Sequence, residues 1–181
     1  RACHGSWSYS ARWLSATTRK TGAGACRSRR ARLASSRVEA RVELLQHIAQ
    51  ATVTIAAEVP EAHPSVSVLG ATRYGTGTLV DRRGFVVTVN YIVVGADRVS
   101  VVDTRGRQHE GILVAHDYSS GIAVLRVPQL DLDPLTPGSS TTVSVGDDVV
   151  TVASVGGEER RSMSAVVASL DPFDAYWEYR L

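Results

Sequence analysis

One stretch, from Gly75 to Asp97, constrains the fold of this chain more than any other. It reads Gly-Thr-Gly-Thr-Leu-Val-Asp-Arg-Arg-Gly-Phe-Val-Val-Thr-Val-Asn-Tyr-Ile-Val-Val-Gly-Ala-Asp. Residues 78–80 and the β-branched run 85–89 flank an Asp-Arg-Arg-Gly turn, and this pattern is typical of a β-hairpin. A polar pair ending in Tyr91 then interrupts the apolar run. The stretch therefore predicts two antiparallel strands followed by a short turn.

Further β-branched runs lie on both sides of this hairpin, separated by turn residues. Helical periodicity is almost absent after residue 50, and many short strands at this spacing predict an all-β domain over residues 51–181. The closed form of such a sheet is an antiparallel barrel, which has no open edges. The predicted runs begin at residue 51 and continue at 98–103, 108–116, 122–127, 143–155 and 164–170.

A short helix is predicted ahead of the first strand, over residues 36–50. Ser36 and Glu39 have the spacing of a capping box, in which each side chain bonds the backbone amide of the other residue. Apolar side chains then recur at spacings of four, three and four residues, which places them on one face of a helix.

The first 35 residues predict a disordered basic arm. Residues 1–38 hold nine basic and no acidic residues, although the whole chain has a net charge of only +2. Such a segment has unbalanced charge and no apolar face to pack. Three interpretations stay open: an unfolded tail, an organelle targeting segment, and translated sequence upstream of the true start. The remaining chain is acidic, so we expect no nucleic-acid binding by the barrel, while the arm stays open in this respect.

The sequence carries no signal for a cofactor, a metal or a membrane span. Cys3 and Cys26 both lie in the arm, where they can pair or stay free, and neither belongs to a Cys-x-x-Cys or Cys/His pattern. The Gly-Thr-Gly at 75–77 precedes a strand instead of a helix, so it is no phosphate loop. No apolar run approaches the roughly 20 residues that span a bilayer.

The stretch from Gly75 to Asp97 resembles the HtrA/DegP-like branch of the trypsin-fold serine proteases. In that family a Gly-Ser-Gly strand leads through a glycine-centred turn to Leu-Thr-Asn-Asn-His-Val-Val, and Gly-Ala-Asp commonly follows. The histidine of that segment is the general base. The same frame holds here without a gap, but Tyr91 stands at the histidine position.

The resemblance extends to the segment that carries the acid of the catalytic triad. The family's Asp-Pro-Arg-Thr-Asp-Leu-Ala-Val-Leu-Lys matches residues 117–126, which read Asp-Tyr-Ser-Ser-Gly-Ile-Ala-Val-Leu-Arg. This register puts Gly121 at the catalytic aspartate, whereas Asp117 matches an earlier aspartate without a catalytic role. Residues 145–150 resemble the family's Val-Gly-Asp-Trp-Val-Leu. The nucleophile motif Gly-Asn-Ser-Gly-Gly does not occur in these 181 residues.

The resemblance implies a trypsin-like fold with altered chemistry. We expect the N-terminal β-barrel of the two-barrel fold and the start of the second barrel. An imidazole titrates near pH 6.5 and serves as a base at neutral pH, whereas a phenol titrates near pH 10 and does not. His109 and His116 are expected as surface or half-buried strand residues that do not replace the base.

The preferred hypothesis is a catalytically inactive HtrA-like domain that serves as a binding or regulatory module for protein or peptide ligands. A first alternative is the N-terminal part of an HtrA-like serine endopeptidase whose serine-bearing half lies elsewhere. A second is a small β-barrel adaptor unrelated to proteases. The resemblance also implies possible homo-oligomers and an extracytoplasmic or periplasmic location, with an organelle as the alternative if the arm is a transit segment.

Overall fold

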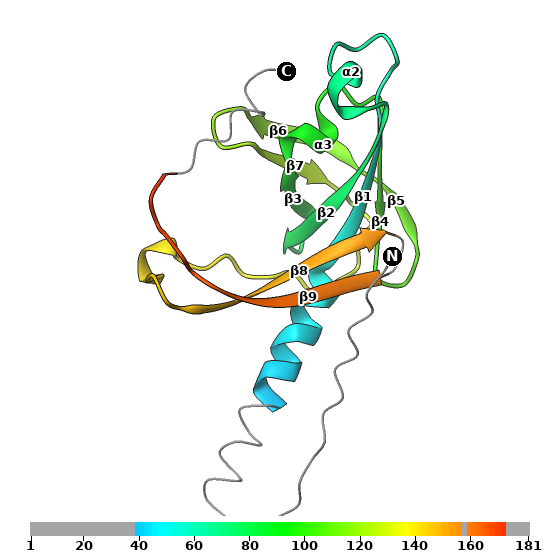
Figure 1. Cartoon of the computed structure of the whole chain (residues 1–181). Helices are drawn as coiled ribbons and strands as arrows, with labels where there is room; N and C mark the ends of the chain where they lie inside the picture. Colours follow the sequence, from blue (N-terminus) through cyan, green and yellow to red (C-terminus); the bar gives the residue numbers. More distant parts are fainter. Residues whose placement is uncertain (1–38, 157–158, 173–181) are drawn as a thin grey trace, which may run out of the picture. The chain divides into compact units, whose positions relative to one another are not determined.

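The computed structural model describes residues 39–156 and 159–172, and β-strands make up most of them (Figure 1). A helix covers residues 39–51 and leads directly into the first strand. The predicted helix at 36–50 is therefore present over its described part. Its predicted N-cap at Ser36 and the predicted basic arm at 1–35 lie outside the described residues. The domain boundaries at 1–35, 36–50 and 51–181 stay predictions.

The strands form one large and one small antiparallel sheet. The large sheet has the order β5-β4-β1-β2-β3-β7-β6, and β8 and β9 form a separate hairpin. Two one-turn helices, α2 (Val66–Leu69) and α3 (Asn90–Val93), and a 3₁₀ turn (Ser140–Thr142) complete the described elements. The strands are β1 (Thr52–Glu58), β2 (Thr72–Asp81), β3 (Phe85–Val89), β4 (Arg98–Val102), β5 (Gln108–Glu110), β6 (Ile112–Asp117), β7 (Ile122–Arg126), β8 (Asp148–Gly156) and β9 (Glu159–Val166).

The large sheet closes on itself at Gly111. Its two edge strands, β5 and β6, are consecutive in the chain and only Gly111 separates them. A side chain at this glycine would lie about 3 Å from Val99 and Val101 in β4 and 3.5 Å from Leu125 in β7. Strands from opposite ends of the sheet order therefore meet at one residue, and the sheet forms the predicted barrel.

The last two strands differ from the predicted ranges. The runs 143–155 and 164–170 predicted two strands, but β8 begins at Asp148 and β9 covers Glu159–Val166. The prediction for the second run was wrong because its first residues are charged and do not look like a strand. Pairing with β8 nevertheless makes them one, since Gly156 pairs with Glu159 and Asp148 with Val166.

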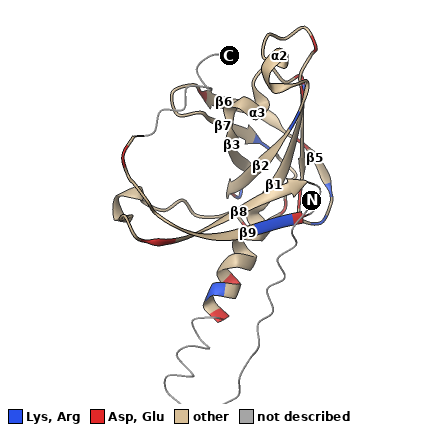
Figure 2. Ribbon diagram, in the orientation of Figure 1, with Lys and Arg blue, Asp and Glu red and all other residues tan. Residues whose placement is uncertain are grey.

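The β8–β9 hairpin is fixed to the barrel by polar bonds. β8 contacts β1 and β2 (Figure 1), and the Ser154 amide donates to Thr76 Oγ1 at 3.0 Å. Arg160 in β9 donates from Nε to the Thr52 carbonyl at 2.8 Å. The basic end of β9 accordingly lies against β1 in Figure 2. The β8–β9 hairpin covers this part of β1, which explains why Thr52 and Thr54 are buried although they point out of the barrel.

The two glycines of the Gly-Thr-Gly motif make room for the barrel core. Side chains alternate across a strand, so positions 75 and 77 of β2 both face the interior. A Cβ at Gly75 would lie 1.8 Å from Ile92 Cδ1 of α3. A Cβ at Gly77 would lie 2.6 Å from Val86 Cγ1 and 2.7 Å from Ile55 Cδ1. These neighbours belong to the buried core: Val53, Ile55, Ala57, Leu79, Val86, Ile92, Val93, Val99, Val101, Ala123, Leu125, Val127 and Leu130.

We predict that Gly77→Ala lowers the free energy of unfolding by about 2 kcal/mol, because overpacked cores force neighbouring side chains out of their rotamers. Gly138→Ala is the matched control, since no atom lies within 4 Å of the added Cβ. Urea unfolding followed by circular dichroism measures both variants. Equal stability of the two variants would contradict this packing.

Candidate active-site rim

The structure brings the two predicted triad positions to the same rim of the barrel. Val89 and Ile122 form the last residue pair of the β3–β7 ladder. Directly beyond it, the Asn90 amide donates to the Gly121 carbonyl at 2.7 Å. Tyr91 follows Asn90 in the chain, so it lies beside Gly121 at the end of the ladder.

Tyr91 is half-buried in the one-turn helix α3. Its side chain packs against the barrel core, and its carbonyl accepts from Arg73 Nη1 at 2.8 Å. The same Arg73 nitrogen donates to the Val94 carbonyl at 3.1 Å. A buried guanidinium therefore binds the carbonyl end of this short segment, where the partial charges of the backbone are negative.

Gly121 is buried and has a left-handed backbone, with φ at 69°. The turn before it is held by Asp117, whose carboxylate accepts from the amide and hydroxyl of Ser119 and from the amide of Ser120. Hydrogen bonds from Ser120 and Ser119 lower the pKa of Asp117 to about 2. Asp117 thus has a structural task in the turn, in keeping with its match to a non-catalytic aspartate.

The two predicted triad positions at this rim are therefore occupied by the phenol of Tyr91 and by Gly121, which has no side chain. A phenol is protonated at neutral pH, and glycine offers no carboxylate to orient a base. The roles of Tyr91 and Gly121 as degenerate triad positions stay predictions, because geometry alone does not assign them.

The other histidines are engaged elsewhere. His116 is exposed and forms an edge-on ring contact with Tyr118 at 4.9 Å. His109, expected at the surface or half-buried, has a side chain only 9% exposed, and its Nε2 lies 3.2 Å from Asp103 Oδ2. Asp103 comes directly after the last residue of β4. The other end of this strand, at Arg98, is the end that follows α3 in the chain. This Asp–His pair is thus at the other end of the barrel from Tyr91.

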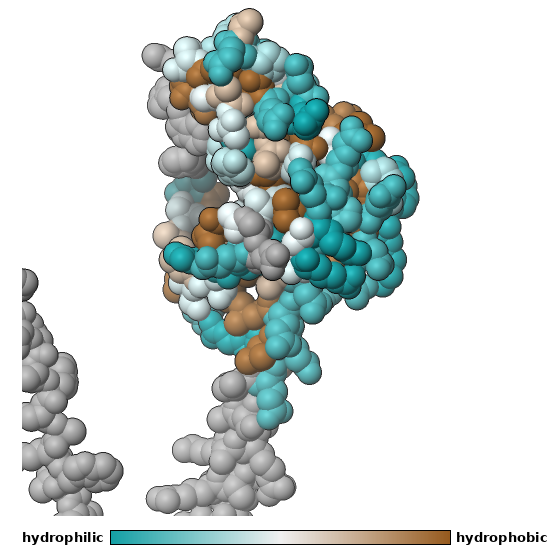
Figure 3. Space-filling model, turned by 90° about the vertical axis from the view of Figure 1, so that its right-hand side faces the viewer, coloured by the Kyte–Doolittle hydropathy of each residue, from teal (hydrophilic) through white to brown (hydrophobic). Residues whose placement is uncertain are grey.

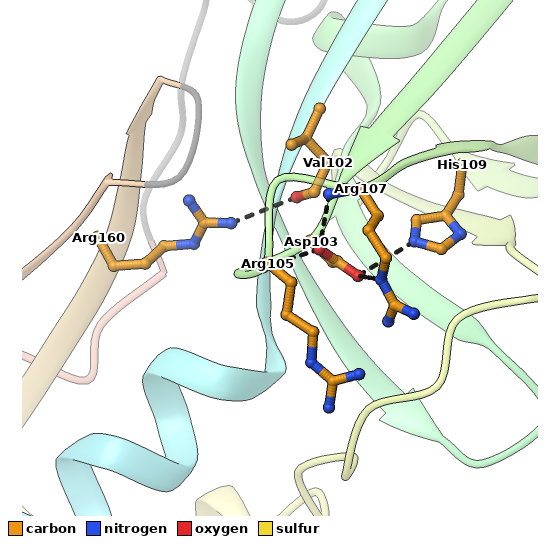
Figure 4. A network of polar contacts seen from close by, with 6 residues as sticks. All are labelled: Val102, Asp103, Arg105, Arg107, His109 and Arg160. Carbon is orange, nitrogen blue, oxygen red and sulfur yellow. Dashed lines mark hydrogen bonds and ion pairs between the residues drawn. The ribbon is translucent and has the colours of Figure 1, made fainter.

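Sequence reasoning missed the network around Asp103, which is fully buried (Figure 4). Its carboxylate accepts from the Arg105 amide at 2.8 Å, the Arg107 amide at 3.0 Å and Arg107 Nε at 2.8 Å. Desolvation raises the pKa of Asp103, but the bonds from Arg107, His109 and Arg105 outweigh it and hold the pKa at about 2. The Asp-Thr-Arg-Gly-Arg sequence signals a turn, but it gives no sign that its aspartate is buried.

Several hollows lie around the described part of the barrel, and two of them are the most relevant here. A cavity of about 370 Å³ lies between β1, β2 and the end of β8, lined by Thr54, Tyr74, Gly75 and residues 154–156. Thr54 and Tyr74 point out of the barrel, so this cavity lies on the outer face of the sheet, and no residue of α3 lines it. A polar cavity of about 380 Å³ at the opposite end includes Arg82 and Arg105 among its lining residues. It shares no residue with the predicted triad positions.

Within residues 39–156 and 159–172, no group of three or more His, Cys, Asp or Glu side chains could hold a metal ion. The helices of the same residues are all too short or too polar to cross a bilayer.

We predict that Asp103→Asn destabilises the fold in a pH-dependent way. The pKa of Asp103 falls from 3.8 to about 2 on folding, so the stabilisation is fully present above pH 4 and is lost as the pH falls from about 4 to 2. At pH 7 the variant should lose about 2 kcal/mol of unfolding free energy, and the difference from the unmodified protein should shrink at low pH. Thermal unfolding between pH 2 and 7 measures this, with Asp131→Asn, at an exposed loop position, as the control. A pH-independent difference would contradict the assignment.

The comparisons with known proteins agree with the barrel and with the sequence motifs. A family model described as "Trypsin-like peptidase domain" matches residues 75–180. The chain is 34% identical over 95 residues to a probable periplasmic serine endoprotease DegP-like of Hahella chejuensis, which covers 52% of this chain and 20% of that protein. It is 30% identical over 79 residues to the serine endoprotease DegS of Escherichia coli, with 43% and 22% covered. The chain thus spans about a fifth of the length of these curated relatives.

A solved structure of the HtrA-type protease AlgW with a tripeptide shares the fold. Its TM-score is 0.59 at 21% sequence identity, and the match covers 69% of this chain and 38% of that one. The hypothesis of an adaptor unrelated to proteases is therefore wrong. From the motifs, the barrel and the family model together, the chain belongs to the trypsin-like peptidase domain family, and the relatives that it resembles are HtrA-like endoproteases.

Proposed function

We propose that this domain is a catalytically inactive member of its family that serves as a binding or regulatory module for extended protein segments. The observation that carries this proposal is the bond between the Asn90 amide and the Gly121 carbonyl. It brings positions 91 and 121 together, which supports the prediction that they are the two triad positions, where a phenol and a glycine would replace the base and the acid.

The energetic cost of these replacements supports inactivity. Loss of triad members lowers the rate by on the order of 10⁶, which corresponds to roughly 8 kcal/mol of transition-state stabilisation. The left-handed backbone at Gly121 adds a second obstacle to recovery of function. An aspartate placed there would pay up to about 1 kcal/mol in backbone strain.

The cavity beside β2 is the binding site that we propose for a peptide. Tyr74 lines this cavity and is 68% exposed. Tyrosine side chains supply large contact area at low entropic cost and dominate many protein interfaces. On the face drawn in Figure 3, exposed apolar side chains form separate areas between polar ones, which favours a local site over a broad apolar interface there.

A second candidate function is the N-terminal part of an HtrA-like serine endopeptidase. The coverage of about a fifth of each curated relative favours it. In that case the serine would come from residues outside this sequence, and Tyr91 would still leave it without its usual base.

The location that we propose is extracytoplasmic, because relatives with this motif are named as periplasmic endoproteases. No comparison supports the organelle alternative. Homo-oligomer formation, which the family resemblance implies, stays a prediction.

We predict binding without covalent chemistry. The protein should bind a fluorescent, unfolded casein peptide in an anisotropy titration, and a serine-directed fluorophosphonate should leave it unlabelled. Tyr74→Ala should weaken binding at least about tenfold, as removal of a central aromatic side chain does at interfaces.

Met163→Ala is the control for this titration. Met163 is 66% exposed on β9 and does not line the cavity. Its removal should leave the affinity unchanged. Labelling of the unmodified protein would disprove inactivity, and equal affinities of the two variants would disprove the location of the peptide site.

A further inference from the structure

A chain of hydrogen bonds links His63 to the segment that carries Tyr91. Arg73 is 5% exposed and donates from Nη2 to Ser65 Oγ at 2.6 Å. Ser65 Oγ lies 2.7 Å from His63 Nδ1. Together with the two bonds from Arg73 to the carbonyls of Tyr91 and Val94, this forms a continuous path between the two segments.

The buried Arg73 is bound by uncharged groups. Its described hydrogen bonds end on the carbonyls of Gly70, Tyr91 and Val94 and on the Ser65 hydroxyl. Burial lowers the pKa of the guanidinium. A buried cation that relies on neutral oxygens is sensitive to the loss of any one of them, because each unpaired donor keeps its full desolvation cost.

The geometry around Ser65 defines the protonation state of His63. The Ser65 amide points its N–H at His63 Nδ1, at 3.3 Å. A backbone amide only donates, so Nδ1 must accept and the imidazole is neutral, with its proton on Nε2. The ring also fits closely against Gly95, since a Cβ there would lie 2.4 Å from His63 Nε2.

We propose that His63, Ser65 and Arg73 form a latch that holds residues 90–95 in place while His63 is neutral and releases them when His63 takes up a proton. A proton on Nδ1 would face the Ser65 amide proton. It would also place two cations, imidazolium and guanidinium, on either side of one hydroxyl group. Both effects disfavour the closed network, so acid opens the loop at 60–70 together with residues 90–95.

The other charged groups near the imidazole do not offset this effect. No ion pair joins His63 to a carboxylate within the described part of the chain, and Glu58 on the preceding strand is paired with Arg98 at 3.9 Å. The charged residues on the segments packed around His63 are Glu61 on its own loop, Glu58 at the end of β1, Asp97 and Arg98 after Gly95, and Arg73 in β2.

The latch goes beyond the proposed function, because it concerns the segment that carries Tyr91 and not the peptide cavity. Hydrogen exchange read by mass spectrometry at pH 7.5 and 5.0, on the whole chain without any ligand, tests it independently of binding. Relative to intrinsic exchange rates, residues 60–70 and 90–95 should exchange at least about tenfold faster at pH 5.0, whereas β1 should not change.

His63→Gln is the decisive variant, because its amide oxygen can accept from Ser65 but takes up no proton in this range. Its exchange should be the same at both pH values. His116→Gln changes an exposed histidine outside the latch and should keep the full response of the unmodified protein.

If His63→Gln does not fold, Ser65→Ala gives the same information. It removes the hydroxyl between the two cations, so both segments should exchange fast at either pH. The proposal would be overturned if exchange in the unmodified protein did not respond to pH. It would also be overturned if His63→Gln or Ser65→Ala kept the pH response. The failure of the latch would leave the peptide-binding result untouched.

Discussion

The absence of two side chains, at Gly75 and Gly77, is the constraint on which the barrel depends. Both glycines face inward from β2, and the space that they leave is filled by Ile92 and by Ile55 with Val86. Because Ile92 belongs to α3, the contact at Gly75 fixes where the segment after β3 lies. The position of Tyr91 therefore follows from packing in the core, and it does not depend on any catalytic contact.

Buried polar groups then tie separate parts of the chain to this core. Arg73 binds the carbonyl end of α3, Asp103 closes the turn between β4 and β5, and Arg160 bonds the β8–β9 hairpin to β1. Each of these three side chains is charged, although the core of the barrel is apolar. Each forms hydrogen bonds with backbone amides or carbonyls that are not paired in a β-ladder. The rim at positions 91 and 121 is intact as a structure, with a tyrosine and a glycine at the two predicted triad positions.

The sequence predicted the barrel and the rim well, because both depend on local patterns. The hairpin from Gly75 to Val89 and the return strand at 122–126 have clear β-branched runs and glycine turns, and the family motif covers them. The polar networks were not predictable, since the burial of Asp103 or Arg73 depends on strands distant in sequence. The shift of β9 to Glu159–Val166 has the same origin, because Arg160 lies in a strand through its pairing with Ser154 of β8, and its side chain bonds β1.

The central claim is that this rim is folded like that of a protease but does no peptidase chemistry. The most direct measurement is a long incubation of the unmodified 181-residue protein with unfolded casein at pH 7.5, with new peptide termini detected by mass spectrometry. We expect no new termini beyond those in a sample without the protein. Casein cleavage that scales with the amount of protein and is lost in Tyr91→Phe would contradict it.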